Sequence, residues 1–182
     1  MIILIIGIII ISLVGTLSHF LYDLTNHNKI VGLFSAVNES TWEHIKIALT
    51  PTLLWSLVDG FIYGMNPNYF LAKSTSLIVI IILMPFLFYG YKVIIKKDLF
   101  ILDIIIFYVV IIASQYSFNL ILNIDEINFV SRYISCIILF ILFGGYMIHT
   151  LMPAKNFIFK DPISNKYGFK GHTETFSIIK DK

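Results

Sequence analysis

The polar segment 37–51, VNESTWEHIKIALTP, holds acids, an imidazole, an indole and a lysine in a chain where charge is scarce. Glu39 and Glu43 stand four residues apart, so both share one helical face if the helix begins a turn before Glu43. His44 follows directly. Neighbouring carboxylates repel each other unless a cation or a proton lies between them, and acid with imidazole suits zinc, manganese or acid–base chemistry. The segment therefore predicts one wall of a metal or acid–base site.

A polar stripe on the preceding apolar run suggests the opposite wall. Its members, at intervals of four, three and four residues, are Ser12, Thr16, His19 and Asp23. At about 100° per residue they form one narrow stripe of a helix, which faces other helices or a water-filled cavity rather than lipid. Asp23 is placed to orient His19, as a carboxylate does for a metal ligand or a base. The alternative is a ladder of interhelical hydrogen bonds beside Gly15, which permits close helix packing, as do Gly144 and Gly145.

The composition indicates the environment of these side chains. The chain of 182 residues is 58% hydrophobic and 13% charged, whereas a soluble domain carries about 25% charge. The difference comes from long uncharged runs, and runs of about 18 or more apolar residues indicate transmembrane helices. The net charge of +2 gives no case for nucleic-acid binding. We therefore expect an integral membrane protein whose main partner is the lipid bilayer.

The apolar runs predict an all-α, polytopic bundle of about five transmembrane helices in residues 1–152, followed by a cytoplasmic amphipathic tail, 153–182. The expected spans are 2–22, 45–63, 71–93, 99–122 and 130–151. No basic residue precedes the first run and no small-x-small cleavage site follows it, so we expect a retained helix. Of the 13 lysine and arginine residues, all but Lys73 and Arg132 lie on one side of these spans. The positive-inside rule then places the N-terminus outside and the C-terminus inside the cell membrane.

A carboxylate lies well inside the second expected span. Asp59 is costly at this depth of a bilayer, so we expect it to face the bundle interior. The SQYSFN motif places Gln115 and Asn119 on one face of the fourth span, which makes them its candidate partners. Pro51 is expected to kink the second span and to release the carbonyl of Ile47, either for structural reasons alone or to open a cavity.

The polar segment also has a purely structural interpretation. Ser40 and Glu43 have the spacing of a capping box, in which each side chain accepts the backbone amide of the other. Such a cap suits a helix that enters a membrane, because its first amides need partners. Trp42 is then expected at the lipid interface, and Lys46 is expected to extend to the headgroups. The cap leaves Glu39 and His44 unexplained.

The tail combines turn signals with interleaved aromatic and basic residues. Turns are indicated at Asp161-Pro162 and at 165–168. The aromatic residues, which suit a position on anionic headgroups, are Phe157, Phe159, Tyr167 and Phe169. Alternatively, the tail folds back under the bundle and brings His172 near the polar segment.

These observations define three sets of candidate residues. The catalytic candidates are His19, Asp23, Glu43 and His44. The candidate ligands of a divalent metal such as zinc or manganese are His19, Glu39, Glu43, His44 and His172. The candidates for binding another ligand are Glu39, Asp59, Gln115 and Asn119.

Three stretches carry a resemblance to a known family: GTLSHFLYDLT at 15–25, VGLFSAVNESTWEHIK at 31–46 and FKDPISNKYGFKGH at 159–172. They resemble short multi-pass bacterial membrane proteins classed as a domain of unknown function, and the VNESxWEHxK element is the most specific part. The similarity covers nearly the whole chain. It implies an integral membrane protein whose tail belongs to the functional unit, and it implies no activity. The chain has no GxSxG, HExxH, P-loop or CxxC signature.

Three functions remain open at this point. One is a polar site at the cytoplasmic face that binds an ion, a small solute or a lipid and serves transport. Another is a membrane-embedded, metal-dependent hydrolase or lipid-modifying enzyme, in which metal-activated water attacks an ester or a phosphate. The last is a structural or accessory subunit, and a homo-oligomer fits any of the three. Convergence of His19, Glu43 and His44 favours the enzyme, whereas a polar cavity that reaches Asp59 favours a carrier.

Overall fold

The computed structural model describes residues 2–97 and 99–172. Its helices are α1 (Ile2–Leu24), α2 (Lys29–Gly32), α3 (Thr41–Tyr63), α4 (Tyr69–Ile95), α5 (Phe100–Leu122), α6 (Phe129–Leu151) and the 3-10 helix η1 (Gly168–Gly171). Within these ranges, 5 helices, α1 and α3 to α6, are long and apolar enough to cross a membrane. The predicted all-α, multi-pass fold is therefore confirmed, and the spans begin and end within a few residues of their expected positions.

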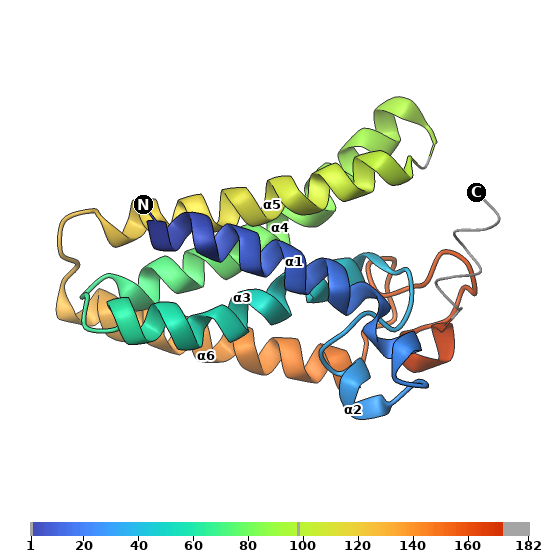
Figure 1. Ribbon diagram of the computed structural model, residues 1–182, viewed down its shortest axis with the longest axis horizontal. Helices are drawn as coiled ribbons and strands as arrows, with labels where there is room; N and C mark the ends of the chain where they lie inside the picture. Colours follow the sequence, from blue (N-terminus) through green and yellow to red (C-terminus); the bar gives the residue numbers. More distant parts are fainter. Residues whose placement is uncertain (1, 98, 173–182) are drawn as a thin grey trace.

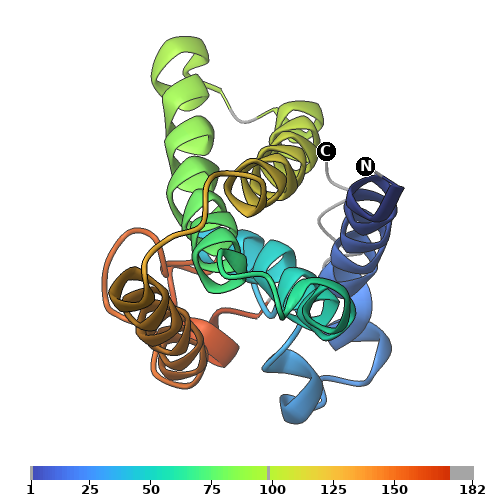
Figure 2. The same ribbon diagram turned by 90° about the vertical axis from the view of Figure 1, so that its left-hand side faces the viewer.

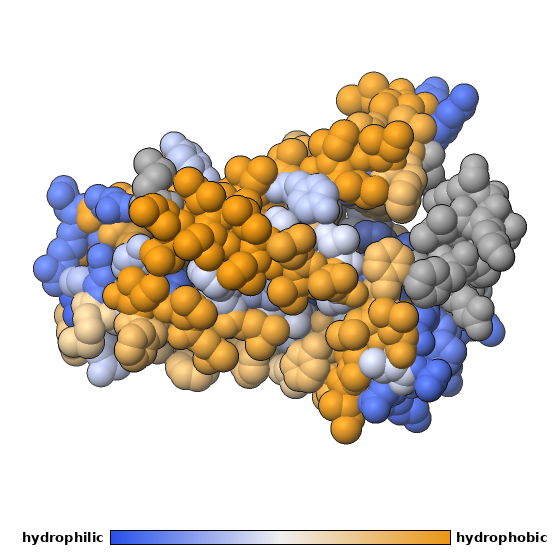
Figure 3. Space-filling model, viewed as in Figure 1, coloured by the Kyte–Doolittle hydropathy of each residue, from blue (hydrophilic) through white to orange (hydrophobic). Residues whose placement is uncertain are grey.

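The long helices run side by side (Figure 1). Helix α4 packs against α3, α5 and α6, while α1 packs against α3 and α5. The end-on view in Figure 2 shows α1, α5 and α6 arranged around the α3–α4 pair. The tip of the α4–α5 hairpin leans away from the other helices (Figure 1). Apolar residues dominate the flank of the bundle and hydrophilic residues gather towards its two ends, as expected of helices that cross a bilayer (Figure 3).

One end of the bundle carries most of the polar chemistry. We call it the polar end: α1 finishes and α3 begins there, and α2 and residues 153–172 cover it (Figure 1). The 5 histidines of the chain lie in or beside it, namely His19, His27, His44, His149 and His172. The start of α3 is therefore enclosed by other segments.

Helix α3 begins after the predicted N-cap, Ser40, but without the expected capping box. The Ser40 side chain makes no capping hydrogen bond, and the Glu43 carboxylate accepts the amide of Val37 at 3.1 Å. The helix starts at Thr41, so Glu39 precedes it and does not share a helical face with Glu43. The capping-box and shared-face predictions are both wrong, because the loop before α3 folds over its first turn.

Lys46 and Trp42 lie inside the protein, so the prediction that they reach the lipid interface is also wrong. Lys46 is 1% exposed, and its Nζ lies 2.6 Å from Glu43 Oε2 and donates to the carbonyl of Gly32 at 2.9 Å. Trp42 packs on Phe159 of the tail, with ring centroids 4.9 Å apart. Helix α2 and the tail therefore cover the start of α3.

The tail folds back onto the polar segment, which was one of the two arrangements expected from the sequence. Asp161 is fully buried, and its Oδ1 accepts the amide of Glu39 at 2.9 Å. Asn38 Nδ2 donates to the carbonyl of Gly168 at 2.9 Å. Gly168 has a φ of 53°, which favours glycine and confirms the predicted turn. These contacts fix the tail residues that precede His172.

Gly15 packs against a carbonyl that Pro51 leaves without its helical amide. Pro51 lies inside α3 and lacks an N–H, so it cannot bond the carbonyl of Ile47. A Cβ on Gly15 would lie 2.6 Å from that oxygen and 2.6 Å from Cζ of Phe107. The expected close packing at Gly15 is therefore confirmed. A Cβ on Gly144 or on the following glycine would meet nothing within 4 Å, so the same prediction for those two is wrong.

Gly15→Ala is expected to lower the free energy of unfolding by about 1–3 kcal/mol, because α1 must move away from a backbone oxygen that cannot give way. Thermal denaturation of the detergent-solubilised protein measures this change. Gly144→Ala is the matched control: the added methyl group meets nothing, so only the gain in helix propensity of about 1 kcal/mol is expected. Equal stability of the two variants would contradict a tight α1–α3 contact.

Candidate functional site

Three side chains from separate segments converge at the polar end. Asp23 lies at the end of α1, His27 in the loop before α2, and His172 at the end of the described tail. One potential ligand atom from each lies within 4.8 Å of the other two. We call this set the Asp23–His27–His172 cluster. Two imidazoles and a carboxylate are the donor types that zinc and neighbouring transition metals prefer.

The separations within the cluster suit ligands of one metal ion. His172 Nε2 lies 2.9 Å from His27 Nε2 and 3.3 Å from Asp23 Oδ1. His27 Nε2 lies 3.6 Å from the same carboxylate oxygen. A tetrahedral ion with ligand bonds of about 2.1 Å holds its ligand atoms about 3.4 Å apart. The separations of 2.9–3.6 Å are therefore close to those that one tetrahedral ion would require.

The polar segment sets the orientation of His172. Its Nδ1 lies 3.0 Å from the carbonyl oxygen of Val37, and a carbonyl can only accept a hydrogen bond. Nδ1 therefore carries the proton in the neutral ring, and Nε2 presents its lone pair to Asp23 and His27. A backbone carbonyl behind a metal-binding imidazole is the usual way to fix its tautomer.

A strained turn places His27. Asn26 and His27 have φ values of 53° and 59°, in the left-handed region that few residues other than glycine adopt. The amide of His27 donates to the carbonyl of Tyr22 at 3.0 Å, which ends α1 and turns the chain back towards Asp23. The cost of this backbone conformation is consistent with a functional reason for the position of the imidazole.

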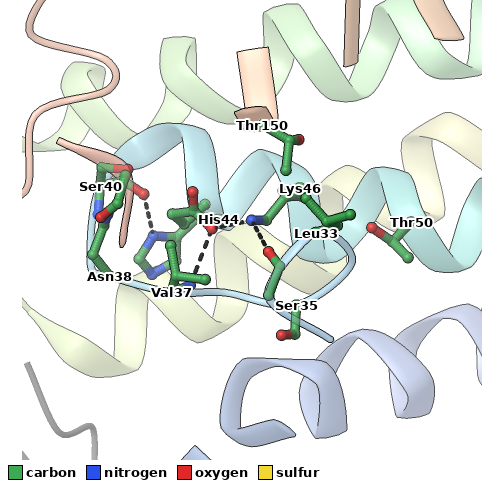
Figure 4. Close-up of polar contacts among 12 residues, drawn as sticks. Leu33, Ser35, Val37, Asn38, Ser40, His44, Lys46, Thr50 and Thr150 are labelled. Atoms are coloured by element: carbon green, nitrogen blue, oxygen red, sulfur yellow. Dashed lines mark hydrogen bonds and ion pairs between the residues drawn. The ribbon is translucent and has the colours of Figure 1, made fainter. Parts of the chain in front are cut away.

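A second acid–imidazole set lies on α1, on the polar segment and at the start of α3. We call it the His19–Glu39–His44 group. Glu39 Oε1 lies 3.6 Å from His19 Nε2, and Glu39 Oε2 lies 3.9 Å from His44 Nε2. His44 Nδ1 lies 3.0 Å from the carbonyl of Ser40, as Figure 4 shows, so its Nε2 faces the glutamate. These separations are too long for hydrogen bonds, and within the described residues Nδ1 of His19 has no hydrogen-bond partner.

The Asp23–His27–His172 cluster and the His19–Glu39–His44 group adjoin each other along the chain. One of their members, His27, was not predicted from the sequence. His19 precedes Asp23 by about one turn of α1, and Glu39 follows Val37 by two residues. His27 was not among the candidates, although it continues the spacing of the polar stripe by four residues beyond Asp23. That continuation was the available signal. The helix ends at Leu24, however, so only the turn of the backbone brings His27 back.

Glu43 does not join His19 and His44, although the sequence placed it among the metal and catalytic candidates. Glu43 is 3% exposed, and its carboxylate pairs with Lys46 and accepts the amide of Val37. Figure 4 shows Lys46 and Val37 joined to this network by dashed lines, beside the ring of His44. Glu43 thus supports the chain segment that holds His172.

Asp59, Gln115 and Asn119 lie towards the other end of the bundle, around one cavity of about 10 Å³. This volume accommodates about one water molecule. Asp59 is 1% exposed, as expected of a residue that faces the interior. Its partners are the Nζ of Lys73 at 2.5 Å and the hydroxyl of Tyr69 at 2.8 Å, rather than the two amides expected from the sequence. The cavity is therefore too small for most solutes.

The comparisons with known proteins agree with the resemblance carried by the sequence. A model of a family of unknown function (DUF6512) matches residues 2–169. The match therefore includes all five long helices and nearly all of the described tail. No curated protein and no solved structure matches the chain.

Proposed function

The chain belongs to DUF6512, a family of unknown function, and we propose that this multi-pass membrane protein binds a divalent transition-metal ion at its polar end. The ligands are Asp23, His27 and His172. The observation that carries the proposal is the convergence of their three ligand atoms within 4.8 Å from three separate segments. The tautomer of His172 and the strained turn at His27 support it.

Zinc is the ion that these donors favour. Two imidazole nitrogens and one carboxylate oxygen match zinc better than calcium or magnesium, which prefer sites made of oxygen atoms. Three protein ligands leave a fourth position of the tetrahedron for water or for a substrate. Such an open position is typical of catalytic rather than structural zinc sites.

The charge distribution favours an orientation in the cell membrane that places the site on the cytoplasmic side. Of the 13 lysine and arginine residues, only Lys73 and Arg132 belong to the sequence segments at the opposite end. Positive loops face the cytoplasm in most membrane proteins. A reporter enzyme that is active only in the cytoplasm, fused to the C-terminus, tests this orientation. An inactive but expressed fusion would contradict it.

Metal analysis of detergent-purified protein tests the proposal. We expect about one zinc ion per wild-type chain, and at least a 10-fold loss of affinity in His172→Ala and in His27→Asn. Asparagine suits position 27 because it tolerates a left-handed backbone, so that variant removes the imidazole with little added strain. His44→Ala removes an imidazole outside the cluster and is expected to retain the ion.

The matched control is His149→Gln, which replaces another histidine of the polar end. His149 packs on Trp42 and Phe159 and takes no part in the cluster. Thermal denaturation of each variant separates loss of a ligand from loss of the fold. Wild-type protein without metal, or full zinc content in His172→Ala, would overturn the proposal and leave the cluster as a contact that ties the tail to the bundle.

A further inference from the structure

Exposed apolar side chains lie on α1, which carries Asp23, and around α2, which follows His27. On α1, Leu17 and Leu24 are 67% and 66% exposed. Around α2, Ile30 is 71% exposed and Phe34 is 44% exposed. Figure 3 shows apolar surface continuing over α2, next to hydrophilic residues of the same end. Apolar residues exposed at the end of a transmembrane bundle lie where headgroups meet acyl chains, so an amphiphile reaches this site more readily than a fully water-soluble molecule.

The His19–Glu39–His44 group lies near a positive charge on α4. The rings of His19 and His44 lie 5.7 Å apart, and the His44 ring stacks on Phe88 of α4 at 6.2 Å. The Nζ of Lys92 lies 3.8 Å from the centroid of Phe88. An ammonium group is thus one aromatic ring away from His44. Lysine is a common partner of phosphate groups, and this end of the protein is also the basic end.

Building on the proposed metal site, we propose that the protein hydrolyses a phosphate ester bond in the headgroup of an anionic membrane phospholipid. Asp23, His27 and His172 would hold the metal, which would activate a water molecule; the oxygen of that water would form a bond to phosphorus while the bond from phosphorus to the leaving alcohol oxygen breaks. Glu39 takes one proton from that water and gives it to the leaving oxygen; the other proton of the water stays with the new phosphate product. We assign this transfer to Glu39 because its half-buried carboxylate lies 3.6 Å from His19, which precedes Asp23 by about one turn of α1.

The test uses zinc-loaded, detergent-purified protein with mixed micelles of phosphatidylglycerol. Phosphorus NMR and mass spectrometry of the lipid identify which bond is cut. We expect a phosphate-containing product from the wild type. Glu39→Gln is expected to react about 100-fold more slowly than the wild type while its zinc content is unchanged. His149→Gln is expected to keep the wild-type rate. Phosphatidylcholine carries a choline cation that balances its phosphate charge, so it is expected to react about 5-fold more slowly.

The outcomes separate this inference from the metal proposal. A full complement of zinc without any lipid product overturns the hydrolase and leaves the metal site standing. Absence of zinc in the wild type overturns both. Release of a fatty acid, rather than of a headgroup or its phosphate, overturns the assignment to a phosphate ester. A wild-type rate in Glu39→Gln overturns the role of Glu39 in proton transfer.

Discussion

Lys46→Met is expected to destabilise the protein by about 3–5 kcal/mol, because it leaves a buried carboxylate without its cation. Lys46 and Glu43 are 1% and 3% exposed, and their charged atoms lie 2.6 Å apart. The same ammonium donates to the carbonyl of Gly32, which also loses its partner. For a chain of this size, the loss corresponds to a fall in melting temperature of about 10 °C. Thermal denaturation in detergent, followed by tryptophan fluorescence, measures it.

The same substitution is expected to weaken the metal site without touching a ligand. Glu43 holds the amide of Val37, and the carbonyl of Val37 fixes the ring of His172. Loss of Lys46 loosens this chain of contacts, so we expect zinc affinity to fall by about 10-fold, as for other changes behind a ligand. Metal titration of the folded fraction measures the effect. Unchanged zinc affinity in a destabilised Lys46→Met variant would contradict the coupling.

Two further variants make the stability prediction specific. Lys29→Met removes an exposed lysine at the same end and is expected to change the free energy of unfolding by less than about 0.5 kcal/mol. Glu43→Gln/Lys46→Met removes both buried charges and is expected to recover most of the loss, because no carboxylate is then left unpaired. A Lys46→Met protein as stable as Lys29→Met would show that the buried pair contributes little.

The spans were predictable because a bilayer constrains the sequence strongly. Each crossing needs about 20 apolar residues, and the sequence shows such runs directly, so α5 was expected at 99–122 and lies at Phe100–Leu122. The interior position of Asp59 followed from the same reasoning, since a carboxylate is costly in lipid. Both predictions use only the apolar environment that a bilayer imposes on each helix, so a single sequence is enough to make them.

The polar end was less predictable because contacts between distant segments decide it. Lys46 was expected at the headgroups, since its spacing alone cannot show that α2 and the tail cover it. His172 was named only as one outcome of a tail that folds back, and His27 was missed because its position depends on a left-handed turn. Glu43 resembled a ligand in the sequence, but its nearest cation is a buried lysine one turn along α3. Spacing along a helix predicts a shared face, whereas loops decide which faces meet.

Lys73→Met is expected to have a comparably large effect towards the opposite end, again about 3–5 kcal/mol. Lys73 is fully buried, and its Nζ lies 2.5 Å from Asp59 Oδ2, while the Tyr69 hydroxyl donates to Oδ1 at 2.8 Å. Without the ammonium, one hydroxyl must stabilise a carboxylate enclosed among membrane-spanning helices. This cost is higher than at a surface, because Asp59 is only 1% exposed and bulk water cannot solvate its charge. Thermal denaturation and the yield of folded protein in detergent measure the loss.

The matched control is Arg132→Gln, because Arg132 pairs with Glu126 at 2.8 Å on the surface, where the side chains are 36% and 67% exposed. An exposed pair contributes less than about 1 kcal/mol, so this variant is expected to resemble the wild type. Asp59→Asn/Lys73→Met removes both interior charges, and most of the stability is expected to return. Equal stability of Lys73→Met and Arg132→Gln would contradict the prediction. It would mean that the interior pair is neutral in the folded protein, with the proton of the Lys73 ammonium transferred to Asp59, because the loss of one partner is this costly only in a charged pair.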